Sequence, residues 1–292
     1  MLGYRTIAST HQLVRSLHRF SSMSTMENRR FKSWPKLTLY GDLNMRPFRN
    51  IWMLEEIGSD YDHISCKPWS KKAKSVHPLG KVPALLVESQ CNGNNQQFVV
   101  LESGAINTFL GDLAREIELV KQSTQHDDSK TTNLLLVPPP ATQLRAKYDS
   151  LVLFIMTELD SQALWIHRKH NDLKDVFGEA PVAVAEAKRQ FDNALKAMEH
   201  EINDDSGYLL PSGFCAADIL LCNCCFWAQQ IGWLARSSSD DSSATDDVGT
   251  TPLTTKLEAY LAQCRHRSAF KKANALRKAQ VEEQTKHDLS KL

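Results

Sequence analysis

The chain has 292 residues, of which 42% are hydrophobic and 24% are charged. This length leaves room for two ordinary domains, and the composition is typical of a soluble globular protein. The net charge of +1 gives no indication of nucleic acid or acidic lipid as a partner, and no apolar run approaches the ~20 residues of a membrane span.

The first 26 residues differ in composition from the rest of the chain. They contain three arginines, many Ser and Thr, and no acidic residue. Such a composition is typical of a transit peptide, and the run Arg-Phe-Ser-Ser that begins at Arg19 resembles a matrix-peptidase cleavage site. We therefore expect a mitochondrial location, or one in another organelle. The alternative is a disordered leader on a cytoplasmic protein that starts at Met23 or Met26.

The segment after this leader predicts a β-α-β unit. Residues 36–40 alternate apolar and polar side chains, as in a short strand. A helix is predicted over residues 47–57, because Pro47 stands at its start and Gly58 just after its end. Residues 61–66 predict a second strand, and the intervening helix implies that the two strands are parallel.

Two further strands and a helix complete the predicted first domain. Residues 82–87 read as a third strand, and 89–97 as a polar hairpin loop. Residues 98–101 then return as an antiparallel fourth strand, and a helix follows from Glu102 to about residue 114. The order β-α-β-β-β-α predicts a thioredoxin-like domain over residues 36–115.

The second half of the chain predicts helices only. Residues 116–139 read as a linker, and 237–251, rich in Ser, Asp and Thr, as a disordered insertion. An all-helical domain is expected over 140–285, so the fold class is α+β with two domains. The predicted helices cover residues 141–170, 181–203, 215–235 and 252–263, with a last one after Ser268.

Seven cysteines occur at spacings that fit neither a disulfide framework nor a metal site. An odd number in a chain of this length argues for a reducing compartment. Cys222, Cys224 and Cys225 lie in an apolar run without a second ligand pair, so we expect buried core residues and no metal.

The stretch from His77 to Leu85, HPLGKVPAL, has the features of a backbone-binding loop. A proline belongs at the start or edge of a strand because it cannot donate a ladder hydrogen bond. A cis bond between Val82 and Pro83 would leave the Val82 amide and carbonyl groups free for an extended peptide. An ordinary proline on an edge strand is the alternative reading.

A second stretch, Glu102-Ser103-Gly104, stands where a strand ends and a helix begins. The free amide groups of a helix N-terminus attract a carboxylate, the Ser103 hydroxyl adds a donor, and Glu102 can pair with an ammonium group. The alternative is a plain helix cap. Because only a hairpin separates the two stretches, both fall on one edge of the sheet. Together they predict a receptor for a small zwitterionic peptide.

Both stretches resemble the two most recurrent glutathione-binding motifs of the glutathione S-transferase family, in particular its bacterial and theta-like classes. Residues 142–235 are similar to the helical domain of that family. There Cys215 replaces the usual Ser or Thr of a capping box, and Asp218 remains. The resemblance implies that Lys81, Val82, Pro83, Glu102 and Ser103 bind glutathione, with a cis peptide bond before Pro83.

The resemblance also aligns Met45 with the catalytic Ser or Cys of related classes. A thioether can neither donate a hydrogen bond to a thiolate nor act as a nucleophile. The candidates to replace the missing hydroxyl are Asn44, Arg46 and a backbone amide at the helix start. We take Asn44 as the predicted catalytic residue.

The resemblance implies conjugation of the glutathione thiolate to a small apolar electrophile, with glutathione as co-substrate, no resident cofactor and a role in detoxification. It also implies a homodimer. The electrophile is expected between the domains, where Trp165 and the basic residues 167–170 either line the cleft or belong to the core and a solvated face. Two other functions stay open. One is binding of glutathione or a protein partner without catalysis, and the other is a glutathione-dependent isomerase or reductase.

Overall fold

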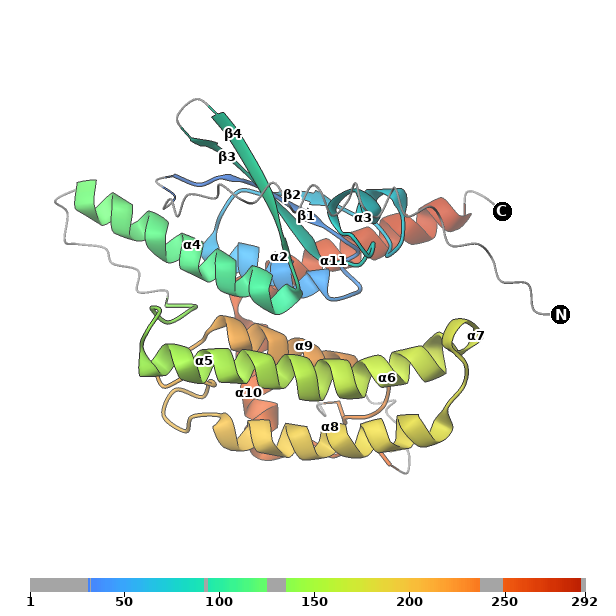
Figure 1. Ribbon diagram of the computed structural model, residues 1–292. Coiled ribbons are helices and arrows are strands. Elements are labelled where there is room, and N and C mark those ends of the chain that lie inside the picture. Colours follow the sequence, from blue (N-terminus) through green and yellow to red (C-terminus); the bar gives the residue numbers. More distant parts are fainter. Residues whose placement is uncertain (1–30, 32, 92–93, 125–134, 237–248, 290–292) are drawn as a thin grey trace.

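The computed structural model describes residues 31, 33–91, 94–124, 135–236 and 249–289. These residues form two layers (Figure 1). The upper layer in that view contains the sheet with α2, α3 and α4, and the lower layer contains α5 to α10. The last helix, α11 (Ser268–Leu289), returns to the upper layer and packs along α2. The two-domain fold class predicted from the sequence is therefore confirmed.

Four strands form one mixed sheet in the order β2-β1-β3-β4. Strand β1 (Lys36–Tyr40) pairs in parallel with β2 (Asp62–Ile64), as the β-α-β pattern predicts. Strands β3 (Ala84–Cys91) and β4 (Asn94–Leu101) are antiparallel to each other, and β3 is also antiparallel to β1.

The prediction for this domain missed one helix and made two strands and another helix too short. Strands β3 and β4 continue through most of the segment predicted as a loop, because backbone pairing at a sheet edge needs no apolar side chains. A short helix, α3 (Lys71–Val76), was not predicted, since its sequence is too polar to give a helical period. Helix α4 (Ser103–Thr124) extends into the segment predicted as a linker.

Helix α2 (Pro47–Ile57) lies across the sheet and provides much of the core of the first domain. Its start at Pro47 and its left-handed cap at Gly58 agree with the prediction. Phe48 and Trp52 are fully buried and contact Phe270 of α11, with ring centroids 6.0 and 4.8 Å apart. The first domain therefore shares its core with the C-terminal helix.

The helical layer begins with one long continuous helix (Figure 1). It consists of α5 (Gln143–Phe154), the π-helix η2 (Ile155–Leu164), α6 (Trp165–His167) and a second π-helix, η3 (Arg168–Asp172). The sequence predicted a helix here but not the π-helical turns, which are often found at functional sites. The remaining helices are α7 (Lys174–Phe177), α8 (Pro181–Glu201), α9 (Ala216–Gln230) and α10 (Thr255–His266).

Helix α9 forms the centre of the helical layer. All six cysteines whose side chains the structure describes are buried and free, as expected for core residues. The Asp218 carboxylate fixes the start of α9 by accepting hydrogen bonds from the Cys215 amide at 2.8 Å and the Leu209 amide at 3.0 Å. The buried Tyr260 hydroxyl donates to the same carboxylate at 3.0 Å. Asp218 therefore holds a helix start that Cys215 alone would cap weakly.

Several predicted features lie outside the described residues. These are the leader over residues 1–26, part of the linker, and most of the insertion over 237–251. Among the helices that the structure describes, none is long and apolar enough to cross a membrane.

Candidate functional site

The loop before β3 presents a free backbone edge. The peptide bond between Val82 and Pro83 is cis, as expected, and ladder pairing of β3 starts only at Ala84. Within the described residues, the Val82 amide and carbonyl groups take part in no hydrogen bond. Val82 is half-buried, so an extended peptide can reach both groups.

Gly41 brings this loop against the turn between β1 and α2. It has φ +139°, and a Cβ atom there would lie 2.3 Å from Cγ of Pro47 and 2.9 Å from Cβ of Val82. Only glycine fits between these two residues. The turn that carries Met45 and the Val82 edge therefore adjoin each other.

Glu102 and Ser103 occupy the junction of β4 and α4. Glu102 is exposed, with φ +68°, and its carbonyl accepts the Ile106 amide at 2.9 Å. A non-glycine residue at positive φ is uncommon and is frequently found at functional sites. Ser103 is the first residue of α4, and its hydroxyl accepts a hydrogen bond from Nη1 of Arg49 at 3.2 Å. Ser103 is buried, and within the described residues its hydroxyl hydrogen has no acceptor.

Beneath Ser103 lies a buried ion pair that joins the two domains. Arg49, which is 0% exposed, donates from Nη2 to Oδ2 of Asp160 in η2 at 2.6 Å. Its Nε donates to Oδ1 of Asn223 in α9 at 2.7 Å. Burial raises the pKa of Asp160, but the charges and hydrogen bonds of Arg49 and Arg46 outweigh it and hold that pKa below its usual value.

This ion pair had no signal in the sequence. Arg49 and Asp160 are separated by 111 positions, and neither belongs to a recognisable motif.

The turn before α2 holds Met45 and the two side chains that were considered for thiol activation, Asn44 and Arg46. Met45 is half-buried and its amide donates to the Asp42 carbonyl at 3.1 Å. The side chain of Asn44 is exposed, and the backbone amide of Asn44 donates to Oδ1 of Asp42 at 2.9 Å. Arg46 points towards the helical domain, where its guanidinium pairs with Asp160.

The C-terminal helix fixes this turn from behind. Nε2 of Gln280 donates to Oδ1 of the buried Asp42 at 2.7 Å, and Nε2 of Gln284 donates to Oδ2 at 3.0 Å. The Leu43 amide in turn donates to Oε1 of Gln280 at 3.3 Å. We refer to Asp42, Gln280 and Gln284 as the turn clamp.

A lysine-bearing segment borders the Val82 loop. The Trp69 amide, just before α3, donates to the Gly80 carbonyl at 2.6 Å. The Gly80 amide donates to the His77 carbonyl, and the Leu79 amide donates to Nδ1 of the same histidine at 3.0 Å. These bonds place the exposed Lys81 and the lysines of α3 beside the free backbone edge.

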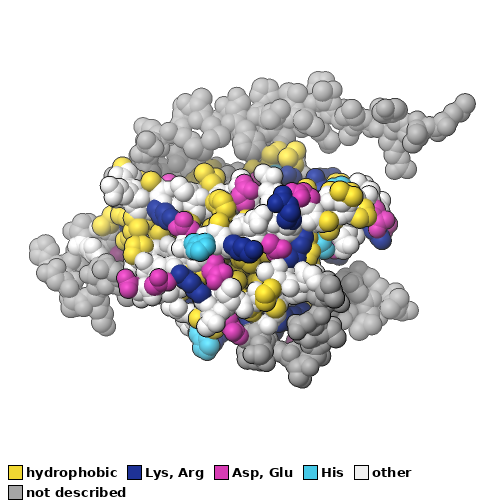
Figure 2. Space-filling model, turned by 90° about the horizontal axis from the view of Figure 1, so that it is seen from below, with side chains coloured by type: hydrophobic (Ala, Val, Ile, Leu, Met, Phe, Trp, Pro, Cys, Tyr) yellow, Lys and Arg dark blue, Asp and Glu magenta, His cyan; other side chains and the backbone are white. Residues whose placement is uncertain are grey.

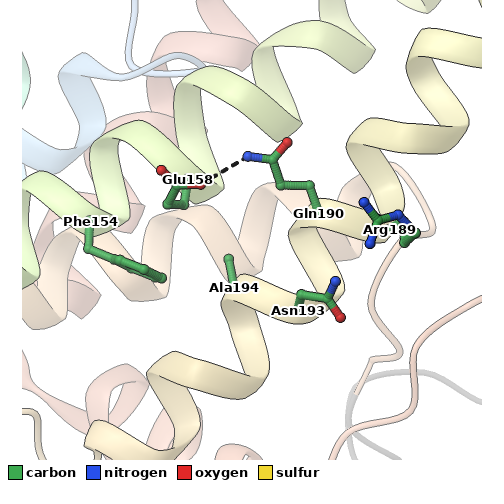
Figure 3. A pocket seen from close by; sticks show the side chains of 6 residues that line it. All are labelled: Phe154, Glu158, Arg189, Gln190, Asn193 and Ala194. Carbon is green, nitrogen blue, oxygen red and sulfur yellow. Dashed lines mark hydrogen bonds between the residues drawn. The ribbon is translucent and has the colours of Figure 1, made fainter.

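A hollow of about 270 Å³ lies elsewhere, between η2 and α8 (Figure 3). Its lining includes Phe154, Glu158 and Gln190, and the last two are hydrogen bonded at 2.9 Å.

On the face seen from below, basic and acidic side chains lie intermixed (Figure 2). None of the predicted site residues lines this hollow, and no group of His, Cys, Asp and Glu in the described part of the chain is arranged to hold a metal.

Comparison with known families and proteins agrees with this fold. Residues 35–112 match the family "Glutathione S-transferase, N-terminal domain". A curated relative, Glutathione S-transferase 1 of Saccharomyces cerevisiae, is 25% identical over 194 residues, which cover 60% of this chain and 74% of the relative.

Solved structures extend the likeness to both domains. A glutathione transferase homolog of Lodderomyces elongisporus, solved with two glutathione molecules per subunit, superposes with a TM-score of 0.61 at 14% identity. That match covers 82% of this chain and 98% of the other. A glutathione transferase of Phanerochaete chrysosporium, solved with oxidized glutathione, gives a TM-score of 0.59 at 16% identity, covering 86% and 99% of the two chains.

Proposed function

We propose that this chain, which carries a glutathione S-transferase N-terminal domain within the two-domain fold of glutathione transferases, binds glutathione and conjugates it to an electrophile. The observation that carries the proposal is the free backbone edge of Val82 beside the junction of Glu102 and Ser103. It offers paired backbone groups, an anion site and an ammonium partner within one site.

Each part of glutathione has a matching group. The cysteinyl amide and carbonyl would pair with Val82 beside Pro83, as in strand addition. The γ-glutamyl carboxylate would accept from the Ser103 hydroxyl and the N-terminus of α4, and its ammonium would pair with Glu102. Lys81 would add positive charge near the carboxylates of the peptide.

Conjugation requires the thiol to lose its proton. A free thiol with a pKa near 8.5 is only a few per cent ionised at neutral pH. The thiolate would then attack an electrophilic carbon of a largely apolar substrate between the domains, forming a C–S bond as the leaving group departs with its electron pair. We propose Asn44 as the donor that stabilises the thiolate, since its exposed amide adjoins Met45.

A second function follows from Met45 itself. Because its thioether cannot donate a hydrogen bond, the site lacks the usual activating hydroxyl. Binding of glutathione or of a protein partner without conjugation is therefore the alternative. Use of glutathione in isomerisation or reduction would need the same binding groups.

The test separates binding from turnover. The purified chain is passed over immobilised glutathione and then assayed with glutathione and a generic aryl halide. We expect retention and turnover. Retention without turnover would support the non-catalytic alternative, and no retention would refute the whole proposal.

Ser103→Ala tests the binding site directly. We expect a loss of roughly 1–3 kcal/mol of glutathione binding free energy, because the bound carboxylate loses a donor. Calorimetric titration measures it. Ser150→Ala, an exposed serine on α5, is the matched control. Equal affinities of Ser103→Ala and the control would remove Ser103 from the site.

Asn44→Ala tests the proposed donor. We expect a lower kcat at unchanged glutathione affinity, whereas Asn171→Ala, an exposed asparagine in η3, should match the parent chain. A kcat for Asn44→Ala equal to that of the control would exclude Asn44 as the activating residue.

Two further proposals concern assembly and location. The family resemblance supports a homodimer, and the composition of residues 1–26 supports delivery to a mitochondrion or another organelle. Sedimentation of the purified protein tests the first. Microscopy of the full chain fused at its C-terminus to a fluorescent protein, with and without residues 1–26, tests the second.

A further inference from the structure

Arg46 places a cation where the second substrate is expected. It follows Met45 directly, and its Nε donates to both carboxylate oxygens of Asp160 at 3.0 Å. The guanidinium carbon lies 5.3 Å from the ring centroid of Trp165 and 5.2 Å from that of Trp227. The side chain is 25% exposed, so this cation between two indoles remains accessible to a ligand.

The charges of this site do not balance. Arg46 and Arg49 share the single carboxylate of Asp160, which leaves one positive charge in excess. Lys169 adds another cation 6.0 Å from the centroid of the Trp165 ring. The negative charge of Glu102 also raises the pKa of Arg46, but we assign Glu102 to the ammonium group of glutathione. An uncompensated charge that is partly desolvated favours an anionic ligand.

Arg46 also has a donor to offer. Its Nε and Nη2 are directed at Asp160, whereas Nη1 has no hydrogen-bond partner within the described part of the chain. Because Asp160 already fixes the plane of the guanidinium, Arg46 would lose little conformational entropy when a ligand carboxylate binds Nη1. The two indoles would contact the apolar remainder of such a ligand.

We infer that the preferred electrophile carries an acidic group, which Arg46 recognises between Trp165 and Trp227. This inference rests on the proposed function and narrows its substrate class from apolar electrophiles to apolar acids. With an aryl chloride as the probe, the glutathione thiolate forms a C–S bond at the ring carbon. Chloride leaves with the electron pair of the C–Cl bond, and the thiol proton passes to solvent.

The experiment compares two probes with the same ring, 4-chloro-3-nitrobenzoate and its methyl ester. For the parent chain and for Arg46→Met, kcat/KM is measured with each probe at saturating glutathione. We expect the ratio of acid to ester to fall at least about ten-fold in Arg46→Met, since a hydrogen-bonded charge pair is lost. Arg189→Met removes the same charge from the exposed surface of α8, where Arg189 pairs with Glu186, and should keep the parent ratio.

Two outcomes would overturn the inference. An unchanged ratio of kcat/KM for the acid and the ester would mean that Arg46 does not recognise the acidic group. An equal loss with both probes would assign Arg46 to the thiolate or to the fold. Should Arg46→Met not fold, the parent chain is tested alone, with unreactive 4-nitrobenzoate and its methyl ester as inhibitors of ester turnover. The inference requires the acid to inhibit at a concentration at least about ten-fold lower.

The failure of conjugation is distinguishable from the failure of this inference. If the chain binds glutathione but turns over neither probe, the proposed reaction is wrong. The acid site is then tested by quenching of tryptophan fluorescence with 4-chloro-3-nitrobenzoate, in the parent chain and in Arg46→Met. Quenching that does not depend on residue 46 would refute the acid site.

Discussion

Arg49 lies in α2 with a fully buried guanidinium, and its charge is matched by Asp160 on the other domain. Removing one member of a buried ion pair leaves the other charge uncompensated and typically costs about 3–5 kcal/mol. The same guanidinium donates to Ser103, so its position also determines how the proposed anion site is presented.

We therefore expect Arg49→Met to lower the free energy of unfolding by about 3 kcal/mol, the lower end of that range, because Arg46 still pairs with Asp160. Urea titration followed by circular dichroism measures it. Arg189→Met is the control, because Arg189 pairs with Glu186 on the exposed surface of α8. The urea midpoint of this variant should stay close to that of the parent chain. Equal midpoints for the two variants would show that the buried pair contributes no net stability.

Asp160 also predicts a pH dependence. The pKa of Asp160 is lower in the folded chain than its value of about 3.9 in the unfolded chain. As the pH falls, the unfolded chain therefore binds the proton before the folded chain does. The stability from this group is present above the unfolded-state pKa and is lost as the pH falls through the folded-state pKa. We expect urea midpoints measured from pH 6 to pH 3 to fall less steeply in Asp160→Asn than in the parent. Parallel curves would contradict this.

At the scale of elements, the turn clamp links α11 to the segment that carries Met45. Asp42 is buried and accepts from both glutamines, so loss of Gln280 leaves its carboxylate short of a donor. The effect should be local, because α11 keeps its aromatic contacts with α2.

We expect Gln280→Ala to cost about 1.5–3 kcal/mol of unfolding free energy, the range for a hydrogen bond to a charged group. It should also speed hydrogen exchange of the Leu43 and Asn44 amides, which mass spectrometry measures. Gln230→Ala, an exposed glutamine at the end of α9, is the matched control. Unchanged exchange in Gln280→Ala would show that the clamp does not order the turn.

The elements themselves were largely predictable. Pro47 and Gly58 bound α2 by local backbone preferences, and the strands around Val82 follow from alternation and turn signals. Helix α3 was not predictable because its sequence is too polar to give a helical period, and the π-helical turns of η2 were not because they depend on tertiary contacts. Met156 and Asp160 in η2 both contact Arg49, a residue more than a hundred positions away in the sequence.

At the scale of the molecule, the two domains share buried interactions. Besides the Arg49 and Asp160 pair, Arg267 donates from Nε to Oε1 of Glu56 at 2.7 Å, and its guanidinium lies 3.8 Å from the centroid of the Phe214 ring. The motifs allowed the sequence to predict that Val82 and Ser103 share a site. Trp165 and residues 167–170 were named as candidates for the cleft, whereas Asp160 and Trp227 could not be predicted, since no local pattern encodes their contacts with Arg46.

We expect the two domains to unfold in one cooperative transition. The calorimetric enthalpy should then equal the van't Hoff enthalpy, and tryptophan fluorescence and far-ultraviolet circular dichroism should give the same midpoint. Two resolved transitions, or different midpoints for the two signals, would show that the domains are energetically independent.

The return of α11 to the first domain has a consequence for biosynthesis. Asp42 leaves the ribosome well before Gln280, which follows it by 238 positions. The β1–α2 turn therefore lacks its clamp while the chain is being made. The nascent protein therefore carries the segments around Val82 and Ser103 long before α11 can fix the turn beside them.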